Sequence, residues 1–336
     1  MTAIKKYIPF ILLALIMLII GYLSGSILGQ RQVETKETLD KVTTSNKIIF
    51  ATGGTGGIYY PLGGAIAKVI NDADLGFEIE VKSTGGSVEN ARLVSSNKAT
   101  LAIMQNDQAY YAMHGMVAFE NRALKNIRAI ASLYPETIQI ITNKNSGITS
   151  VVDLKGKKIA VGAKGSGTVE NTKQILEVYG ISMNDIKPIY SSFSEATVLL
   201  KHNQIDAAFL TAGAPTSAVT ELSESIPIKI IPIEIAKANE LTARYPYYEQ
   251  DVIKAGAYSG VLDDVPTVAV MAILVTNKEA DNTMIYKITK TIFDNENRIK
   301  KLHEKGAYIK KESALSGISI KLHLGAAAYY NKIGIL

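Results

Sequence analysis

The stretch ATGGTGGIYYPLGGAIAKVI, residues 51–70, follows directly on the apolar run KIIF and carries six glycines between Gly53 and Gly64. Apolar residues then recur at helical spacing as far as Ile70. The pattern predicts a strand (48–53), a glycine-rich loop and a helix (58–72). Glycine in such a loop allows a ligand to approach the backbone closely.

The loop fails both common phosphate-binding motifs. A P-loop needs a lysine after its last glycine, but Ile58 follows Gly57. The dinucleotide fingerprint needs a glycine where Tyr59 stands. What remains is the exposed N–H groups and the positive end of a helix dipole, which hold a carboxylate as readily as a phosphate.

Two further loops have the same form, STGGSVEN (83–90) and GAKGSGT (162–168). In the second, Glu170 occupies the last position of the dinucleotide fingerprint and would repel a pyrophosphate. Ligands bind at the carboxyl ends of strands in open α/β sheets. The three loops together therefore predict one joint binding site.

Strand-like and helix-like segments alternate along the rest of the chain, which predicts an α/β fold with mostly parallel sheets. The predicted strands are 78–84, 101–105, 158–163, 186–190 and 205–212, and the predicted helices are 87–96, 168–180, 194–203, 215–225 and 281–303.

Two strand-like segments resemble each other, IQIITNKN (138–145) and MAILVTNKE (271–279), and one complete βαβ series lies between them. This arrangement predicts two lobes, with the chain crossing outward once and returning once. Lobe 1 comprises residues 47–136 plus 270–336, and lobe 2 comprises residues 137–269.

The N-terminus reads as a targeting segment. Lys5 and Lys6 precede an uncharged apolar run from Tyr7 to Leu28, which is long enough to cross a bilayer. Residues 1–29 are therefore a signal peptide or an uncleaved membrane anchor, and 30–46 form a flexible polar tether. The two lysines should stay cytoplasmic, so the rest of the chain is extracytoplasmic, in the periplasm or on the outer face of the cytoplasmic membrane.

Composition excludes several classes of protein. The chain has no cysteine, hence no thiol nucleophile, Cys-ligated metal or disulfide framework. Without Lys5 and Lys6, the chain has 34 basic and 31 acidic residues, which give a formal charge of +3, and it has no dominant basic run. Nucleic acid is therefore not an expected partner.

The motifs in their order resemble the TAXI-type solute receptors of TRAP transporters, over about residues 48–335. Besides the loops quoted above, the resemblance rests on LAIMQND (101–107), ASLYPE (131–136), DAAFLTAGAP (206–215) and KLHLGAAAYYNKIG (321–334). Leu324 stands where the family usually has a proline. The resemblance implies a two-lobed periplasmic-binding-protein fold (type II) with two hinge crossovers and no cofactor, which we expect to be monomeric.

The resemblance also implies function. The receptor would capture a small organic anion or amino acid, such as glutamate, glutamine or a related five-carbon dicarboxylate, and deliver it to a TRAP membrane permease. The ligand-binding residues expected by position are Thr55, Gly57, Tyr59, Gly85, Gly86, Ser87, Asn90, Gln105, Asn106, Asp107, Tyr134, Glu136, Ser166, Gly167, Thr168, Thr211 and Gly213.

Several of these residues have expected roles. Ser166, Gly167 and Thr168 should donate to a ligand carboxylate, and Ser87 with the N–H groups of Gly85 and Gly86 should do so from the other lobe. The two tyrosines, Tyr59 and Tyr134, would cover apolar carbons or donate through their hydroxyls. Asp107 or Glu136 would pair with an ammonium, and Arg92 or Lys164 with a second carboxylate.

Other classes of function remain open to different degrees. None of the four histidines has another histidine nearby in sequence and no G-x-S-x-G elbow occurs, so no enzyme is expected. A ligand-binding sensor without transport is one alternative. A receptor for an oxyanion or phosphonate is another, although among the glycine loops only GAKGSGT contains a basic residue, Lys164.

Overall fold

The computed structural model describes residues 46–336. The predicted targeting segment 1–29 lies outside the described residues, as does the predicted tether 30–46 except for Asn46, where strand β1 begins. Residues Ile48–Leu336 form one compact unit. Between residues 46 and 336, no helix is both long and apolar enough to cross a membrane.

The first lobe is built around three strands that alternate with helices. The strands are β1 (Asn46–Ala51), β2 (Phe77–Lys82) and β3 (Leu101–Gln105), and the helices are α2 (Tyr59–Asn71), α3 (Ser87–Ser95) and α4 (Asn106–His114). All five residues of β3 are buried, with Leu101 and Ile103 packed among α2 residues and Ala102 and Met104 among α3 and α4 residues. Helices thus cover both faces of the sheet, which explains the unbroken apolar run.

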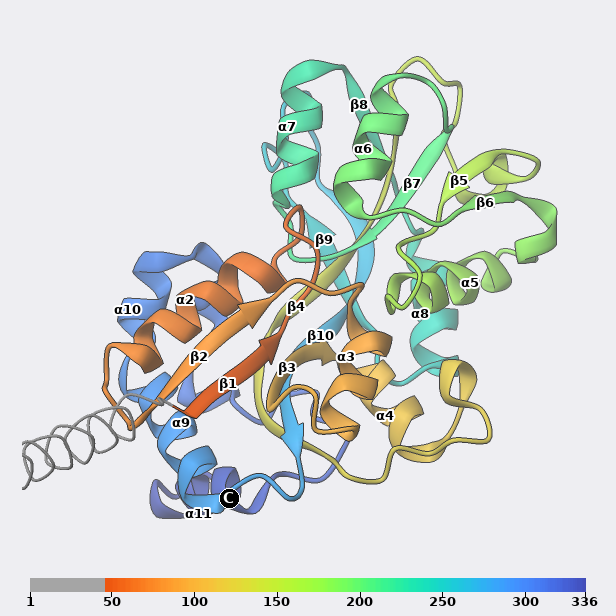
Figure 1. The fold of residues 1–336 in the computed structure, drawn as a ribbon. Helices are drawn as coiled ribbons and strands as arrows, with labels where there is room; N and C mark the ends of the chain where they lie inside the picture. The colour runs from red at the N-terminus through yellow and green to blue at the C-terminus, as the bar shows by residue number, and fades with distance from the viewer. Residues whose placement is uncertain (1–45) are drawn as a thin grey trace, which may run out of the picture. The chain divides into compact units, whose positions relative to one another are not determined.

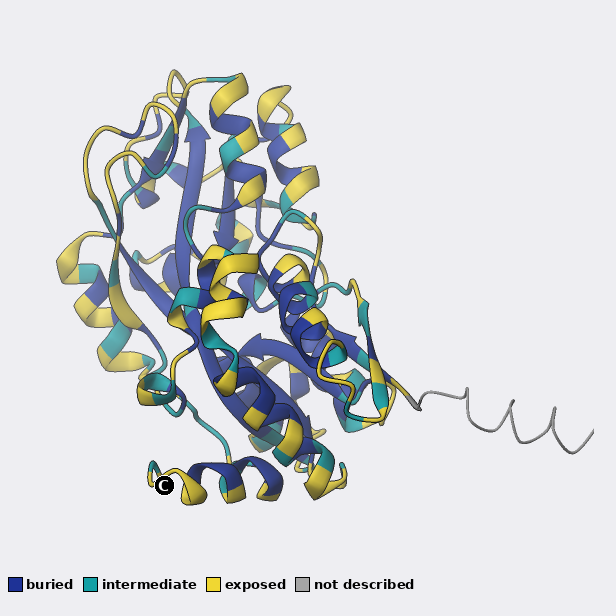
Figure 2. Ribbon diagram, turned by 90° about the vertical axis from the view of Figure 1, so that its left-hand side faces the viewer, coloured by how far each residue is buried: buried dark blue, intermediate teal, exposed yellow. Residues whose placement is uncertain are grey.

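The second lobe repeats this plan. Its strands are β5 (Lys158–Ala160), β6 (Lys187–Ile189), β7 (Ala207–Thr211) and β8 (Ile228–Ile231), and its helices are α5 (Thr168–Val178), α6 (Phe193–Lys201), α7 (Ser217–Ser225) and α8 (Ile235–Arg244). One core packs Ile159 against α5 and α8, and another packs Ala160 against α6 and α7. Figure 2 shows buried strands between helices whose outer sides are exposed.

Two long antiparallel strands join the lobes, β4 (Ile127–Asn143) and β10 (Val265–Asn277), and β9 (Glu249–Ile253) pairs with β10 (Figure 1). β4 pairs with β10 as far as Thr137, and with β7 from Ile138 onward. The two crossovers are therefore the strands that carry the T-N-K repeats. The change of partner falls in the middle of β4, beside Glu136, whereas the repeats lie at the outer strand ends.

These crossing strands make each sheet mixed. The βαβ parts are parallel, as in the pairs β1/β3, β5/β6 and β5/β7. β4 runs antiparallel to β7 where it enters lobe 2, and β10 runs antiparallel to β3 where it returns to lobe 1.

The predicted helix 281–303 is two helices, α9 (Asn282–Asp294) and α10 (Glu296–Leu302). They break at Asn295, whose side chain donates to Thr291 O and so competes with the helical backbone. The chain then passes through short 3₁₀ turns to α11 (Leu324–Lys332), which is tied to β4 by the Tyr330 hydroxyl donating to Ile130 O at 2.8 Å. The 3₁₀ turns are η2 (Val117–Phe119), η3 (Val151–Leu154), η4 (Met183–Asp185), η5 (Glu304–Tyr308) and η6 (Lys311–Ser313).

Candidate ligand-binding site

The three glycine loops meet. They lead from β1 to α2, from β2 to α3 and from β5 to α5, and together with the ends of β3, β4 and β7 they surround a cavity of about 350 Å³. The first two loops belong to one lobe and the third to the other. The volume is within the range of small-molecule sites.

Most of the residues expected from the sequence line this cavity. They are Thr55, Gly57, Tyr59, Gly85, Gly86, Ser87, Gln105, Tyr134, Glu136, Ser166, Gly167, Thr168 and Thr211. They come from loops and strand ends up to 156 positions apart in the sequence, and the two-lobed fold brings them together.

Four expected residues, Asn90, Asn106, Asp107 and Gly213, lie outside the cavity wall. Asn90 is fully buried behind it, where its amide donates to Thr52 O at 2.6 Å and Ile103 O at 2.7 Å. Asn106 donates to Gly317 O at 3.0 Å and accepts from Met271 N at 3.2 Å. Both side chains therefore hold the backbone together.

Gly213 lies against a side chain that a larger residue would displace. A Cβ at this position would lie 2.7 Å from Cε of Lys305 and 3.3 Å from Tyr134. The buried ammonium of Lys305 donates to Ala214 O and lies 3.7 Å from Glu304.

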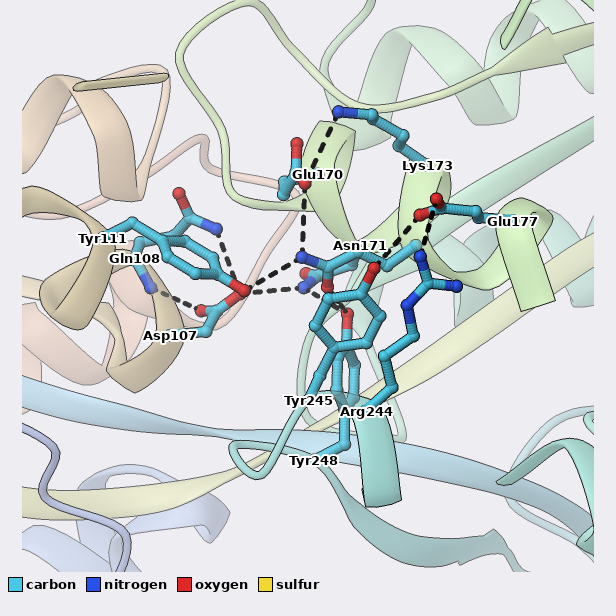
Figure 3. A network of polar contacts seen from close by, with 11 residues as sticks. Asp107, Gln108, Tyr111, Glu170, Asn171, Lys173, Glu177, Arg244, Tyr245 and Tyr248 are labelled. Atoms are coloured by element: carbon cyan, nitrogen blue, oxygen red, sulfur yellow. Dashed lines mark hydrogen bonds and ion pairs between the residues drawn. The ribbon is translucent and has the colours of Figure 1, made fainter. Parts of the chain in front are cut away.

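Asp107 belongs to a buried polar network between the lobes, drawn in Figure 3. Its carboxylate accepts from Asn171 Nδ2 on α5 at 3.1 Å, and Asn171 also donates to the Tyr248 hydroxyl at 2.8 Å. One helical turn along, Gln174 donates to the Tyr111 hydroxyl at 3.0 Å. Burial raises the pKa of Asp107 to about 6. The network joins α4 of lobe 1 to α5 of lobe 2, so Asp107 is a contact between lobes.

The two expected cationic partners lie elsewhere. Arg92 donates to Ala118 O at 2.9 Å and stacks over Phe119, and the exposed Lys164 lies over the Tyr190 ring. Within the described chain, no lysine, arginine or histidine lines the cavity.

Sequence reasoning missed the wall formed by Ser192, Phe193 and Ser194 at the start of α6. Ser192 caps α6 through a capping box with Glu195, a signal that the sequence SFSE carries. The lining is completed by Ile58, Ala212 and six smaller residues of the glycine loops: Gly53, Gly54, Gly56, Ser83, Thr84 and Ala163.

The lobes touch around the cavity. Gly165 O accepts hydrogen bonds from Val88 N at 3.0 Å and from Glu89 N at 3.2 Å. The loop that precedes α5 therefore uses two of the first N–H groups of α3. A Cβ on Gly167 would lie 1.7 Å from Gln105 Oε1 across the lobes. The conformation is therefore a closed one, and Gly167 is required for this close approach.

The N–H groups expected to hold a carboxylate differ in availability. Gly85 N donates to Glu89 Oε2 at 2.7 Å and Gly86 N to Thr84 Oγ1 at 3.1 Å, so the α3 loop is occupied by its own side chains. By contrast, α2 and α5 begin at the cavity without a side-chain cap, and the first N–H groups of a helix lack partners within it. The anion-binding character of the cavity therefore belongs to α2 and α5.

The cavity wall opposite α5 carries an acid. Glu136, 1% exposed, accepts from the Tyr59 hydroxyl at 2.6 Å, and that hydroxyl lies 3.3 Å from Ser87 Oγ. Burial raises the pKa of Glu136 to about 8, although hydrogen bonds from Tyr59 and Gln105 counteract part of the rise. Three lining residues have a buried oxygen without a partner: Gln105 Oε1, the Tyr134 hydroxyl and Ser166 Oγ.

This arrangement suits capture of a small polar solute. It offers uncapped helix starts, unpartnered polar atoms, a buried carboxyl group and the aromatic surfaces of Tyr59, Tyr134 and Phe193. No cluster of three or more acidic or histidine side chains in residues 46–336 could hold a metal ion.

Solved structures of low sequence identity share the fold. PhnD1 from Prochlorococcus marinus, in complex with methylphosphonate, is 11% identical over 87% of this chain and 99% of its own, with a TM-score of 0.54. The alkanesulfonate-binding protein SsuA from Xanthomonas axonopodis pv. citri is 14% identical over 86% and 94%, with a TM-score of 0.51. A Bordetella bronchiseptica RB50 protein is 20% identical over 85% and 82%, also at 0.51.

These matches establish the type II periplasmic-binding-protein fold, as the sequence predicts. The NMT1-like family model matches residues 50–334, which include all three glycine loops and both crossing strands. The chain therefore belongs to the NMT1-like family.

Proposed function

We propose that the protein is the extracytoplasmic solute receptor of a TRAP-type secondary transporter. It captures a small carboxylate between its lobes, namely glutamate, glutamine, 2-oxoglutarate or a similar five-carbon compound, and delivers it to the membrane permease. The observation that carries this proposal is the enclosed polar cavity at the junction of the lobes, with two uncapped helix starts in its wall.

The fold supports capture by closure. Strand β4 pairs with β10 along its first part and with β7 and β8 along its last part, and β10 pairs with both β3 and β9. These pairings support lobe limits of 47–136 plus 270–336 and 137–269. Loops of both lobes touch at Gly165 and Gly167. A ligand held by both lobes favours this closed state through its differential affinity.

The starts of α5 and α2 are the proposed carboxylate sites. Gly167 and Thr168 offer backbone N–H groups, and the buried hydroxyl of Ser166 has no partner. Because the dipole of each helix presents its positive end here, a carboxylate is stabilised without a basic side chain. The TAXI-like motifs of the sequence support the same class of solute and the TRAP-type partner.

An oxyanion receptor is the less favoured alternative. SsuA is an alkanesulfonate-binding protein and PhnD1 was solved with methylphosphonate, but those proteins share only the fold with this chain. A phosphonate dianion would find no basic side chain in the described lining of the cavity to balance its two charges. A sensor role without transport would use the same cavity and differs only in its membrane partner.

Thermal unfolding of the full-length protein against a panel of solutes tests the proposal. The panel contains L-glutamate, L-glutamine, 2-oxoglutarate, 2-hydroxyglutarate, succinate, phosphate, sulfate and methylphosphonate. A ligand at 100 times Kd should stabilise the fold by about 2.7 kcal/mol. Gly167→Asp should abolish the shift, whereas Gly64→Asp, in a helix with open space around it, should keep it. A shift with phosphate, sulfate or phosphonate alone would refute a carboxylate receptor.

A further inference from the structure

Glu136 occupies an unusual place in the site. It stands on β4 where the strand passes from one lobe to the other, and it lines the cavity while almost fully buried. The Tyr59 hydroxyl donates to it at 2.6 Å, and Gln105 supplies a second side-chain hydrogen bond. A buried carboxylate is costly unless a cation or several donors compensate it.

Among residues 46–336, the groups around Glu136 supply no cation. Tyr59 from α2 and Tyr134 from β4 face it, and Asp107 from α4 adds a negative charge near it. The buried ammonium of Lys305 is bound to Ala214 O and lies beside Glu304. Because burial raises the pKa of Glu136 to about 8, its carboxyl group is protonated at neutral pH while no cation faces it.

The neighbours of Glu136 match an ammonium group. Gln105 Oε1 and the Tyr134 hydroxyl oxygen are buried without partners, and both residues line the cavity beside Glu136. An ammonium has three N–H donors, one for the carboxylate and one for each of these oxygens. The oxo group of a 2-oxo acid only accepts, so it would leave Gln105 Oε1 unsatisfied.

We infer that Glu136 receives the ammonium group of an α-amino acid and gives up its proton as that ligand binds. This inference rests on the proposed function, since the ligand carboxylate lies at the start of α5. The balance is simple: the carboxyl group becomes a carboxylate, the proton passes to the solvent, and the ammonium keeps all its protons. Glu136 is thus the residue that selects amino acids over 2-oxo acids of the same carbon skeleton.

Isothermal titration calorimetry of the full-length protein tests the inference with L-glutamate and 2-oxoglutarate, which differ only at the α-substituent. Titrations at pH 7 in two buffers of different ionisation enthalpy count the protons. L-Glutamate should release on the order of one proton and bind at least about tenfold tighter than 2-oxoglutarate. Glu136→Gln should lose both the proton release and that preference.

The control is Glu249→Gln, an exposed carboxyl on β9 that should change neither value. Proton release by the wild-type protein needs no variant, so a misfolded Glu136→Gln does not obscure the result. Equal affinity for the two ligands without proton release would overturn the inference and leave the carboxylate receptor standing. Failure of both ligands and of L-glutamine to bind the wild-type protein would overturn the proposed function, and this inference with it.

Discussion

Replacing Glu136 by glutamine should remove a pH dependence from the stability of the ligand-free protein. Burial raises the pKa of this carboxyl group to about 8 in the fold, from an ordinary value of 4.5. Between these two pH values the folded state holds a proton that the unfolded state has lost. The contribution of Glu136 to the free energy of unfolding is therefore complete below pH 4.5 and decreases as pH rises toward 8.

The window from pH 6.5 to 8.5 isolates this effect. With the two pKa values above, the wild-type protein should lose about 2 kcal/mol relative to Glu136→Gln across it. For a chain of this length, that corresponds to a relative fall of about 3 °C in Tm. Asp107, whose pKa is about 6, contributes mainly below this window.

Differential scanning calorimetry of both proteins at pH 6.5, 7.5 and 8.5 measures the gap in Tm directly. Glutamine keeps the shape of the protonated acid, so the variant should fold with the same cavity wall. Glu249→Gln provides the control, with a gap that stays flat. If the gap for Glu136→Gln is also flat, the buried carboxyl group is ionised in the folded protein and the electrostatic reasoning is wrong.

Two further substitutions test the residues that lie outside the cavity. Asp107→Ala removes the acceptor for Asn171 between the lobes, so the closed state should become less stable. The Kd of the captured solute should then rise by about tenfold, or about 1.4 kcal/mol, as measured by calorimetric titration. An unchanged Kd would mean that the contact does not favour closure. Asn90→Ala leaves two buried carbonyl oxygens without this donor and should lower the free energy of unfolding by about 2–4 kcal/mol, while the Kd of the solute stays within about threefold of the wild-type value. Thermal unfolding measures the first quantity and calorimetric titration the second. A loss of affinity at unchanged Tm would mean that Asn90 contacts the ligand.

Local sequence predicted most elements because each signal acts over a few residues. The apolar run of β3 and its bounds, 101–105, agree with the prediction, as does the start of α3 at Ser87. The helix predicted over 281–303 was wrong in its continuity, because the break at Asn295 depends on one side chain competing for the backbone. The observed starts of α6 and α7 differ from the predicted ones by one and two residues, because the boundaries of a helix are least well defined at its caps.

The composition of the site was partly predictable. Glycine loops after strands point to a ligand regardless of distant contacts, and thirteen of the seventeen expected residues line the cavity. Asn90 and Asp107 belong to the same sequence motifs as residues that do line the cavity, so the sequence does not distinguish them from those residues. Only the packing shows that Asn90 donates to the backbone oxygens of Thr52 and Ile103 behind the cavity wall, and that Asp107 accepts from Asn171 on α5 of the other lobe.

The sequence by itself determined the α/β class, the two-lobed plan and the positions of the glycine loops, because periodicity and glycine content are local properties of the chain. Tertiary structure alone decided which N–H groups remain available to a ligand. Glu89 and Gly165 occupy the start of α3, whereas no side chain caps α5. Tertiary structure also decided the charge of the cavity, since a pKa depends on burial and neighbours. Packing buries Glu136, and no basic side chain of the described residues lines the cavity beside it.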